Sequence, residues 1–165
     1  MKKILFFLIL IPAISIGQSP CKAAVSTDPF EGVKSVSKKT QLSAQEMNGS
    51  RLMFALTKFS KGEETEFLAT FHGRTYMKGC VAEGKTKVVV LYSDGDKSEL
   101  FYTGSVDCGI YWVSVSVPLE ELEKLETKTA TQVRLNYSDG VDDFKVADKW
   151  QPKLQETVRC VRSVN

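Results

Sequence analysis

The strongest constraint on the fold is the alternation of apolar and polar side chains in residues 85–117. Residues 86–92 and 98–103 are joined by the turn sequence Ser-Asp-Gly-Asp, and a third alternating run covers residues 110–117. A period of two is typical of half-buried strands, and Asp-Gly favours a tight hairpin turn. We therefore predict a β-hairpin that is followed by a third strand.

A second hairpin is expected near the other end of the chain, where residues 131–137 also run into Ser-Asp-Gly and then into residues 143–146. The two hairpins differ on one face, which carries Val89 and Leu91 in the first and Arg134 and Asn136 in the second. A strand that is apolar on both faces is usually covered on both sides, whereas an alternating strand keeps one face in water. We expect residues 86–92 to be central and covered, and residues 131–137 to lie nearer the surface.

Three more strands are predicted upstream, at residues 40–45, 51–59 and 64–72, with a turn at Asn48-Gly49. Alternation directs one set of their side chains toward a core: Leu52, Phe54, Leu56, Phe67, Ala69 and Phe71. In residues 110–117, the set expected in the core is Tyr111, Val113, Val115 and Val117.

Two helices are predicted downstream. The first covers residues 118–126, because Pro118 suits a first helical position and three leucines, Leu119, Leu122 and Leu125, are spaced to share a face. The second covers residues 149–161, with Asp148 as its cap and with an apolar side made of Trp150, Leu154, Val158 and Val161. The fold class is therefore mainly β, an antiparallel β-sandwich or partly open barrel with a short helix and a C-terminal helix. This layout resembles that of small exported proteins of Gram-negative bacteria.

The N-terminus has the pattern of a signal peptide. Two lysines precede an apolar run at residues 4–11, which is shorter than the roughly 20 residues that a membrane-spanning helix needs. Small residues favour cleavage after Gly17. We predict a signal peptide at 1–17, an irregular segment at 18–32, a single β-rich domain at 33–165 and no transmembrane segment after cleavage.

Export changes the charge balance. The chain has 22 basic and 20 acidic residues, so loss of Lys2 and Lys3 with the leader leaves the two signs equal. Without an excess of positive charge, the chain lacks the electrostatic signature of a nucleic-acid-binding protein. We expect a periplasmic or extracellular location and no nucleic-acid partner.

Four cysteines in an exported chain predict two disulfide bonds. We favour Cys80–Cys108, because these residues bracket the central hairpin, which leaves Cys21–Cys160 to join the ends. A Cys21–Cys80 pairing and a free Cys160 are the alternatives. The chain has no Cys-x-x-Cys motif, so neither a zinc site nor a thioredoxin-like motif is expected.

Catalytic and metal-binding motifs are weak. His72 is the one histidine, and it lacks a recognisable nucleophile or orienting acid nearby in sequence. Asp94, Asp96 and Ser98 have the spacing of the first calcium-loop ligands, but the later ligand positions do not fit, and Asp-Gly turns explain them better. The acidic group Asp139, Asp142 and Asp143 lacks that spacing. We expect no cofactor, no metal and no catalytic residue.

Trp112 is the strongest candidate for a binding residue. If Tyr111 points into the core, strand geometry turns Trp112 outward beside Ser114 and Ser116. That surface suits a stacked sugar or a protein contact, although a helix covering this face would bury Trp112 instead.

We therefore expect a non-enzymatic binding or interaction module with a protein or glycan partner. One alternative is a carbohydrate-active or other hydrolase whose carboxylates converge only in the fold. Another is an inhibitor or immunity-type protein that uses the loop at residues 73–84, held by Cys80.

Overall fold

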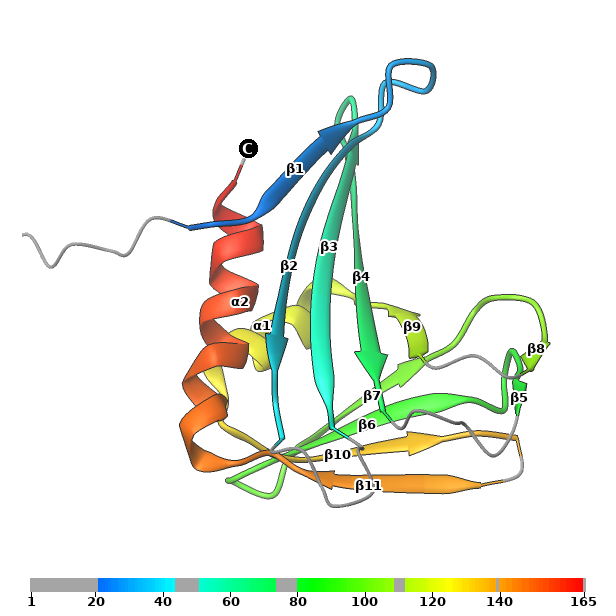
Figure 1. Ribbon diagram of the computed structural model, residues 1–165, viewed down its shortest axis with the longest axis vertical. Coiled ribbons are helices and arrows are strands. Elements are labelled where there is room, and N and C mark those ends of the chain that lie inside the picture. Colours follow the sequence, from blue (N-terminus) through cyan, green and yellow to red (C-terminus); the bar gives the residue numbers. More distant parts are fainter. Residues whose placement is uncertain (1–20, 44–50, 74–79, 109–111, 139, 165) are drawn as a thin grey trace, which may run out of the picture.

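The computed structural model describes residues 21–43, 51–73, 80–108, 112–138 and 140–164 (Figure 1). The predicted signal peptide, the Asn48-Gly49 turn and Tyr111 lie outside these residues, as do Asp139 and residues 74–79 of the loop at 73–84.

The described residues form three antiparallel sheets. The strands of the five-stranded sheet are, in spatial order, β1 (Ala24–Thr27), β2 (Lys34–Gln41), β3 (Met53–Lys61), β4 (Glu64–His72) and β9 (Trp112–Ser116). The strands of the four-stranded sheet are β11 (Val141–Lys145), β10 (Ala130–Asn136), β6 (Lys87–Tyr92) and β7 (Lys97–Phe101). A small pair consists of β5 (Cys80–Val81) and β8 (Asp107–Cys108).

The helices are α1 (Leu119–Thr127) and α2 (Gln151–Ser163), and the 3-10 turn η1 (Asp148–Trp150) precedes α2. Figure 1 shows the four-stranded sheet crossing one end of the five-stranded sheet, with α2 running alongside β2. Neither sheet closes on itself in the described part of the chain. The predicted class, a mainly β antiparallel sandwich-like fold with two helices, is confirmed.

The core lies between the two larger sheets and the helices. The predicted inward residues of β3 and β4 are buried, and the Phe54 and Phe71 rings lie 5.2 Å apart between centroids. β4 begins and ends at the predicted residues. In the second half of β4, Phe67, Ala69 and Phe71 face the core and are buried. The side chains between them lie on the opposite face of the sheet and are not buried, which produces the clear alternation.

α1 confirms the predicted short helix, with Pro118 as its N-cap residue and with Leu122 and Leu125 buried. The expectation for Leu119 is wrong, because its side chain is 64% exposed. Successive residues turn by about 100° around an α-helix, so positions six apart are about 120° apart and cannot share a narrow buried face.

α2 confirms the C-terminal helix, with Leu154, Val158 and Val161 buried and Pro152 in the first turn. The predicted cap is wrong, because η1 intervenes and the helix begins after Trp150. Asp148 instead accepts a hydrogen bond from the side chain of Gln151 at 3.3 Å. Trp150 is half-buried and lies in the 3-10 turn rather than on the buried face of α2.

The N-terminal strands differ from the predictions. β1 lies inside the segment expected to be irregular, and β2 begins six residues before the expected strand. All four side chains of β1 are exposed, and β2 buries only Val36 within its length. Backbone pairing to β2 and β3 forms these strands, so they lack the apolar alternation by which a strand is recognised.

β6 lies inside its sheet as expected, between β10 and β7. Its second face is not covered, however, because Leu91 is 38% exposed and Val89 is only half-buried. β10 has the predicted wet face, with Arg134 exposed. One face of the four-stranded sheet therefore meets the core and the other meets solvent.

Candidate binding surface

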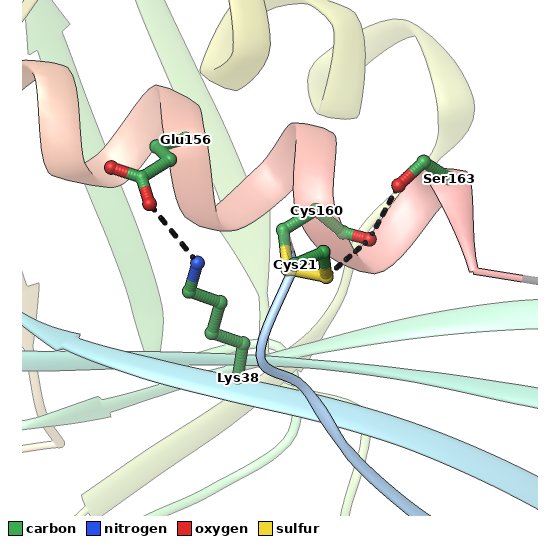
Figure 2. The surroundings of a disulfide bond; sticks show 5 residues. All are labelled: Cys21, Lys38, Glu156, Cys160 and Ser163. Atoms are coloured by element: carbon green, nitrogen blue, oxygen red, sulfur yellow. Dashed lines mark hydrogen bonds and ion pairs between the residues drawn. A yellow bond between two sulfur atoms is a disulfide. The ribbon is translucent and has the colours of Figure 1, made fainter. Parts of the chain in front are cut away.

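Two disulfide bonds hold the fold, in the pairing that the sequence favours. Cys80 and Cys108 are register partners of β5 and β8, with Cα atoms 4.1 Å apart. Cys21 and Cys160 join the segment before β1 to α2, with Cα atoms 5.3 Å apart. Figure 2 shows the Cys21–Cys160 bond and, beside it, an ion pair that joins β2 to α2. In this pair Lys38 Nζ lies 3.2 Å from Glu156 Oε1.

α2 occupies only one side of the five-stranded sheet. We call the other side the outer face. It is made of the side chains that alternate with the buried ones and share a register: Ser35, Ser37, Lys39, Gln41, Met53, Ala55, Thr57, Phe59, Glu66, Leu68, Thr70, His72, Trp112, Ser114 and Ser116. Each of them is half-buried or exposed, and hydroxyl groups recur among them.

Trp112 lies on the outer face at the edge strand β9 and is 44% exposed. Neither helix therefore buries it. Its register partner is His72, and the two rings have centroids 5.7 Å apart and are tilted by 36°. This contact holds the indole against the sheet and leaves part of its surface in solvent.

The hydroxyl groups predicted beside Trp112 follow it along β9. Ser114 Oγ lies 2.9 Å from the Thr70 hydroxyl, and Ser116 is exposed. A similar pair lies farther across the sheet, where Thr57 Oγ1 is 3.1 Å from Ser37 Oγ. Such paired hydroxyls keep their remaining lone pairs available to a ligand.

His72 lies beside Trp112 and is influenced by the charge of Lys39. Partial burial, followed by the charge of Lys39, lowers the pKa of His72 below its usual value. The described groups that contact or perturb its ring are an indole and an amine.

The two aspartates of the β6–β7 turn form ion pairs with a lysine. Lys128 Nζ lies 2.8 Å from a carboxylate oxygen of Asp94 and 2.8 Å from one of Asp96, and these bonds lower the pKa of both aspartates. Gly95, with φ of +85°, makes the turn between them. Ser98, the third residue of the calcium-loop spacing, points inward and is buried.

The other acidic group is also engaged in side-chain pairing: Asp143 receives two hydrogen bonds from Arg134, at 2.7 and 2.9 Å. Within the described ranges, no three residues among histidines, cysteines and acids are grouped so that they could hold a metal ion.

The surface has two hollows that the sequence did not predict. One lies over the β1–β2 turn, where Phe30 is 95% exposed, and Phe59 is among its lining residues. The other is a depression of about 450 Å³ in the open face of the four-stranded sheet, lined by Val89, Leu91 and charged side chains. The first had only a faint signal, an aromatic residue directly after a proline in a polar segment.

Comparison with known proteins adds no assignment, since no family model, curated protein or solved structure matches the chain. None of the helices that the structure describes is long and apolar enough to cross a membrane.

Proposed function

We propose that this protein is an exported, non-enzymatic binding domain that recognises a saccharide through the outer face around Trp112. Its place of action is the periplasm or the extracellular space. The two disulfide bonds support export, because such bonds form and persist in oxidising compartments.

The observation that carries the proposal is the part-exposed Trp112 ring, in tilted contact with His72 at the edge of a hydroxyl-bearing sheet. The C–H face of a pyranose is apolar and its rim is polar, so it pairs with an aromatic ring that has hydrogen-bonding groups beside it. The imidazole of His72 on β4 and the hydroxyls of Ser114 and Ser116 on the neighbouring edge strand β9 supply those groups.

The contacts at this surface support binding rather than hydrolysis. A glycosidase needs two carboxyl groups, about 5–10 Å apart, on either side of the scissile bond. The described contacts of Trp112, Thr70 and Ser114 join a ring and hydroxyls. No observation at this surface therefore favours the hydrolase alternative.

The test is binding of soluble oligosaccharides, including peptidoglycan fragments, followed by tryptophan fluorescence. The chain has two tryptophans, so the Trp150→Phe variant makes Trp112 the one reporter. We expect a saturable change in its emission with at least one oligosaccharide class, and a loss of about tenfold or more in affinity on Trp112→Ala.

Phe101→Ala is the matched control, because Phe101 is 51% exposed and lies on the other large sheet. It should bind as the native protein does, and mass spectrometry should show the oligosaccharide intact after incubation. Equal affinity of Trp112→Ala and native protein would refute the proposed surface, and cleavage of the ligand would refute its non-enzymatic character.

A further inference from the structure

A second surface lies at the far end of the same sheet. The turns that join β1 to β2 and β3 to β4 project together beyond the rest of the molecule (Figure 1). We call this region the tip and define it as residues 24–35 and 59–66. No buried side chain lies within it, so it contributes nothing to the core.

The β1–β2 turn has an ordered structure that presents Phe30 to solvent. Asp28 and Val33 are joined by a backbone hydrogen bond of 2.8 Å, and Gly32 donates to the Asp28 carbonyl at 2.9 Å. Asp28 Oδ1 also accepts the N–H groups of Phe30 and Glu31, at 2.8 and 3.2 Å. Phe30 is 95% exposed on a turn whose backbone is held at each of these points.

Phe30 forms one wall of the hollow at the tip, about 570 Å³ in volume. The floor is a row of register partners from three strands, Ser26, Ser35 and Phe59. Pro29 and Val33 add apolar surface, and Asp28 and Glu31 add carboxylates. Aromatic faces combined with carboxylates suit a guanidinium or ammonium group on an aliphatic stem.

The charge of the tip points to the same ligand. Its five carboxylates belong to Asp28, Glu31, Glu63, Glu64 and Glu66, and its two amines to Lys34 and Lys61. Lys61 is already paired with Glu31, at 3.1 Å. The tip therefore has a negative field, which attracts cationic segments and repels anionic lipid surfaces.

The backbone next to the hollow is also suited to a partner. β1 ends the five-stranded sheet, and among the described strands it pairs with β2 alone. An extended segment can add to such an edge through main-chain hydrogen bonds, while a neighbouring pocket selects its side chains.

We infer that the tip is a docking site for an extended, positively charged segment of a partner protein, with an arginine or lysine side chain in the hollow between Phe30 and Phe59. The segment lies along β1 and is held by the carboxylates of the tip. This site is separate from the surface around Trp112, and either site can be present without the other.

The experiment measures fluorescence anisotropy of labelled peptides of about eight residues in which arginine and valine alternate. We expect saturable binding to the native protein, no binding of the same peptide with glutamate in place of arginine, and weaker binding as salt rises. Phe30→Ala should weaken binding about fivefold or more, and Glu31→Gln should weaken it less.

Two controls separate this site from general attraction and from the Trp112 surface. Glu123→Gln on α1 makes the same charge change as Glu31→Gln at another exposed position, and Trp112→Ala removes the other aromatic site. Both should bind the arginine peptide normally. The inference fails if native protein does not bind, if Phe30→Ala binds equally well, or if the glutamate peptide binds. It fails also if Phe30 is required for binding anionic vesicles rather than the peptide.

Discussion

The hydroxyl of Tyr92 lies 2.7 Å from the hydroxyl of Ser98, across the hairpin formed by β6 and β7, and both residues are 2% exposed or less. A buried hydroxyl that loses its partner costs about 1–3 kcal/mol, because its water is not restored. We expect Tyr92→Phe and Ser98→Ala each to lower the free energy of unfolding by that amount. The double variant should lose much less than the two losses combined, and chemical denaturation measures all three. Fully additive losses would show that the hydroxyls do not act as a pair.

The same residue makes stability depend on pH at the alkaline end. Burial raises the pKa of Tyr92 to about 12, and the nearby carboxylates of Glu121 and Asp96 act in the same direction. Because the unfolded pKa is about 10, the neutral phenol stabilises the fold below that pH, and this contribution is lost as the pH rises toward about 12. Ultraviolet titration should show a tyrosinate step near pH 12 that is missing in Tyr92→Phe. The same step in both proteins would contradict the assignment.

α1 offers two leucines with opposite environments. Leu122 is fully buried and Leu119 is 64% exposed. Leu122→Ala should therefore lower the free energy of unfolding by about 2–5 kcal/mol, through lost burial and a cavity. Leu119→Ala should change it by less than about 0.5 kcal/mol. Urea titration of both variants gives the comparison, and equal effects would mean that the helix faces the core differently.

Lys128 is expected to stabilise the β6–β7 turn by neutralising Asp94 and Asp96. Lys128→Ala should lower the urea midpoint at neutral pH, by less than a core truncation does, because the pairs are at the surface. The hydrogen bonds to Lys128 lower the pKa of both aspartates. The stabilisation is therefore present above their usual pKa and is lost as the pH falls through the lowered values.

Lys85→Ala is the charge-matched control for Lys128, since Lys85 is exposed. It should leave the urea midpoint unchanged at both neutral and acidic pH. A difference between Lys128→Ala and native protein that persists in strong acid would show that the lysine stem, not its charge, stabilises the turn.

Alternation predicted the elements that touch the core and failed for those that do not. β4 could be predicted to the residue, because Phe67, Ala69 and Phe71 alternate with side chains on an open face. β1 could not, since its backbone pairs with β2 while all its side chains stay in water. Because β6 is apolar on both faces, Leu91 was predicted to be covered. No other part of the described fold packs over it closely, and Leu91 is 38% exposed.

Of the two candidate surfaces, one could be predicted in part from local alternation and the other could not. The outward direction of Trp112 follows from its place in an alternating strand, although its contact with His72 depends on the pairing of β4 with β9. The exposure of Phe30 depends on a hydrogen-bonded turn and on strands that extend past the core. Apart from an aromatic residue after a proline, no local pattern of residues indicates that overhang, so the sequence did not predict the tip hollow.

The two disulfide bonds should differ in their response to reduction. Cys108 is exposed and Cys80 is half-buried, whereas Cys21 is half-buried and Cys160, within α2, is only 6% exposed. A reductant must reach a sulfur atom to attack it, so limited reduction followed by alkylation and mass spectrometry should label Cys80 and Cys108 first. In denaturant this order should disappear. Early labelling of Cys21 and Cys160 in the native protein would contradict the expectation.

The disulfide that is reduced second, Cys21–Cys160, should contribute more to the free energy of unfolding than Cys80–Cys108. Cys80 and Cys108 are 28 residues apart in sequence, and Cys21 and Cys160 are 139 apart. The loss of loop entropy in the unfolded chain grows with that separation, which gives about 3–4 kcal/mol for the short loop and about 5 kcal/mol for the long one. Replacing each pair with serines should lower the free energy of unfolding by these amounts. A larger loss for the Cys80–Cys108 pair would show that packing around β5 and β8, rather than chain closure, dominates its contribution.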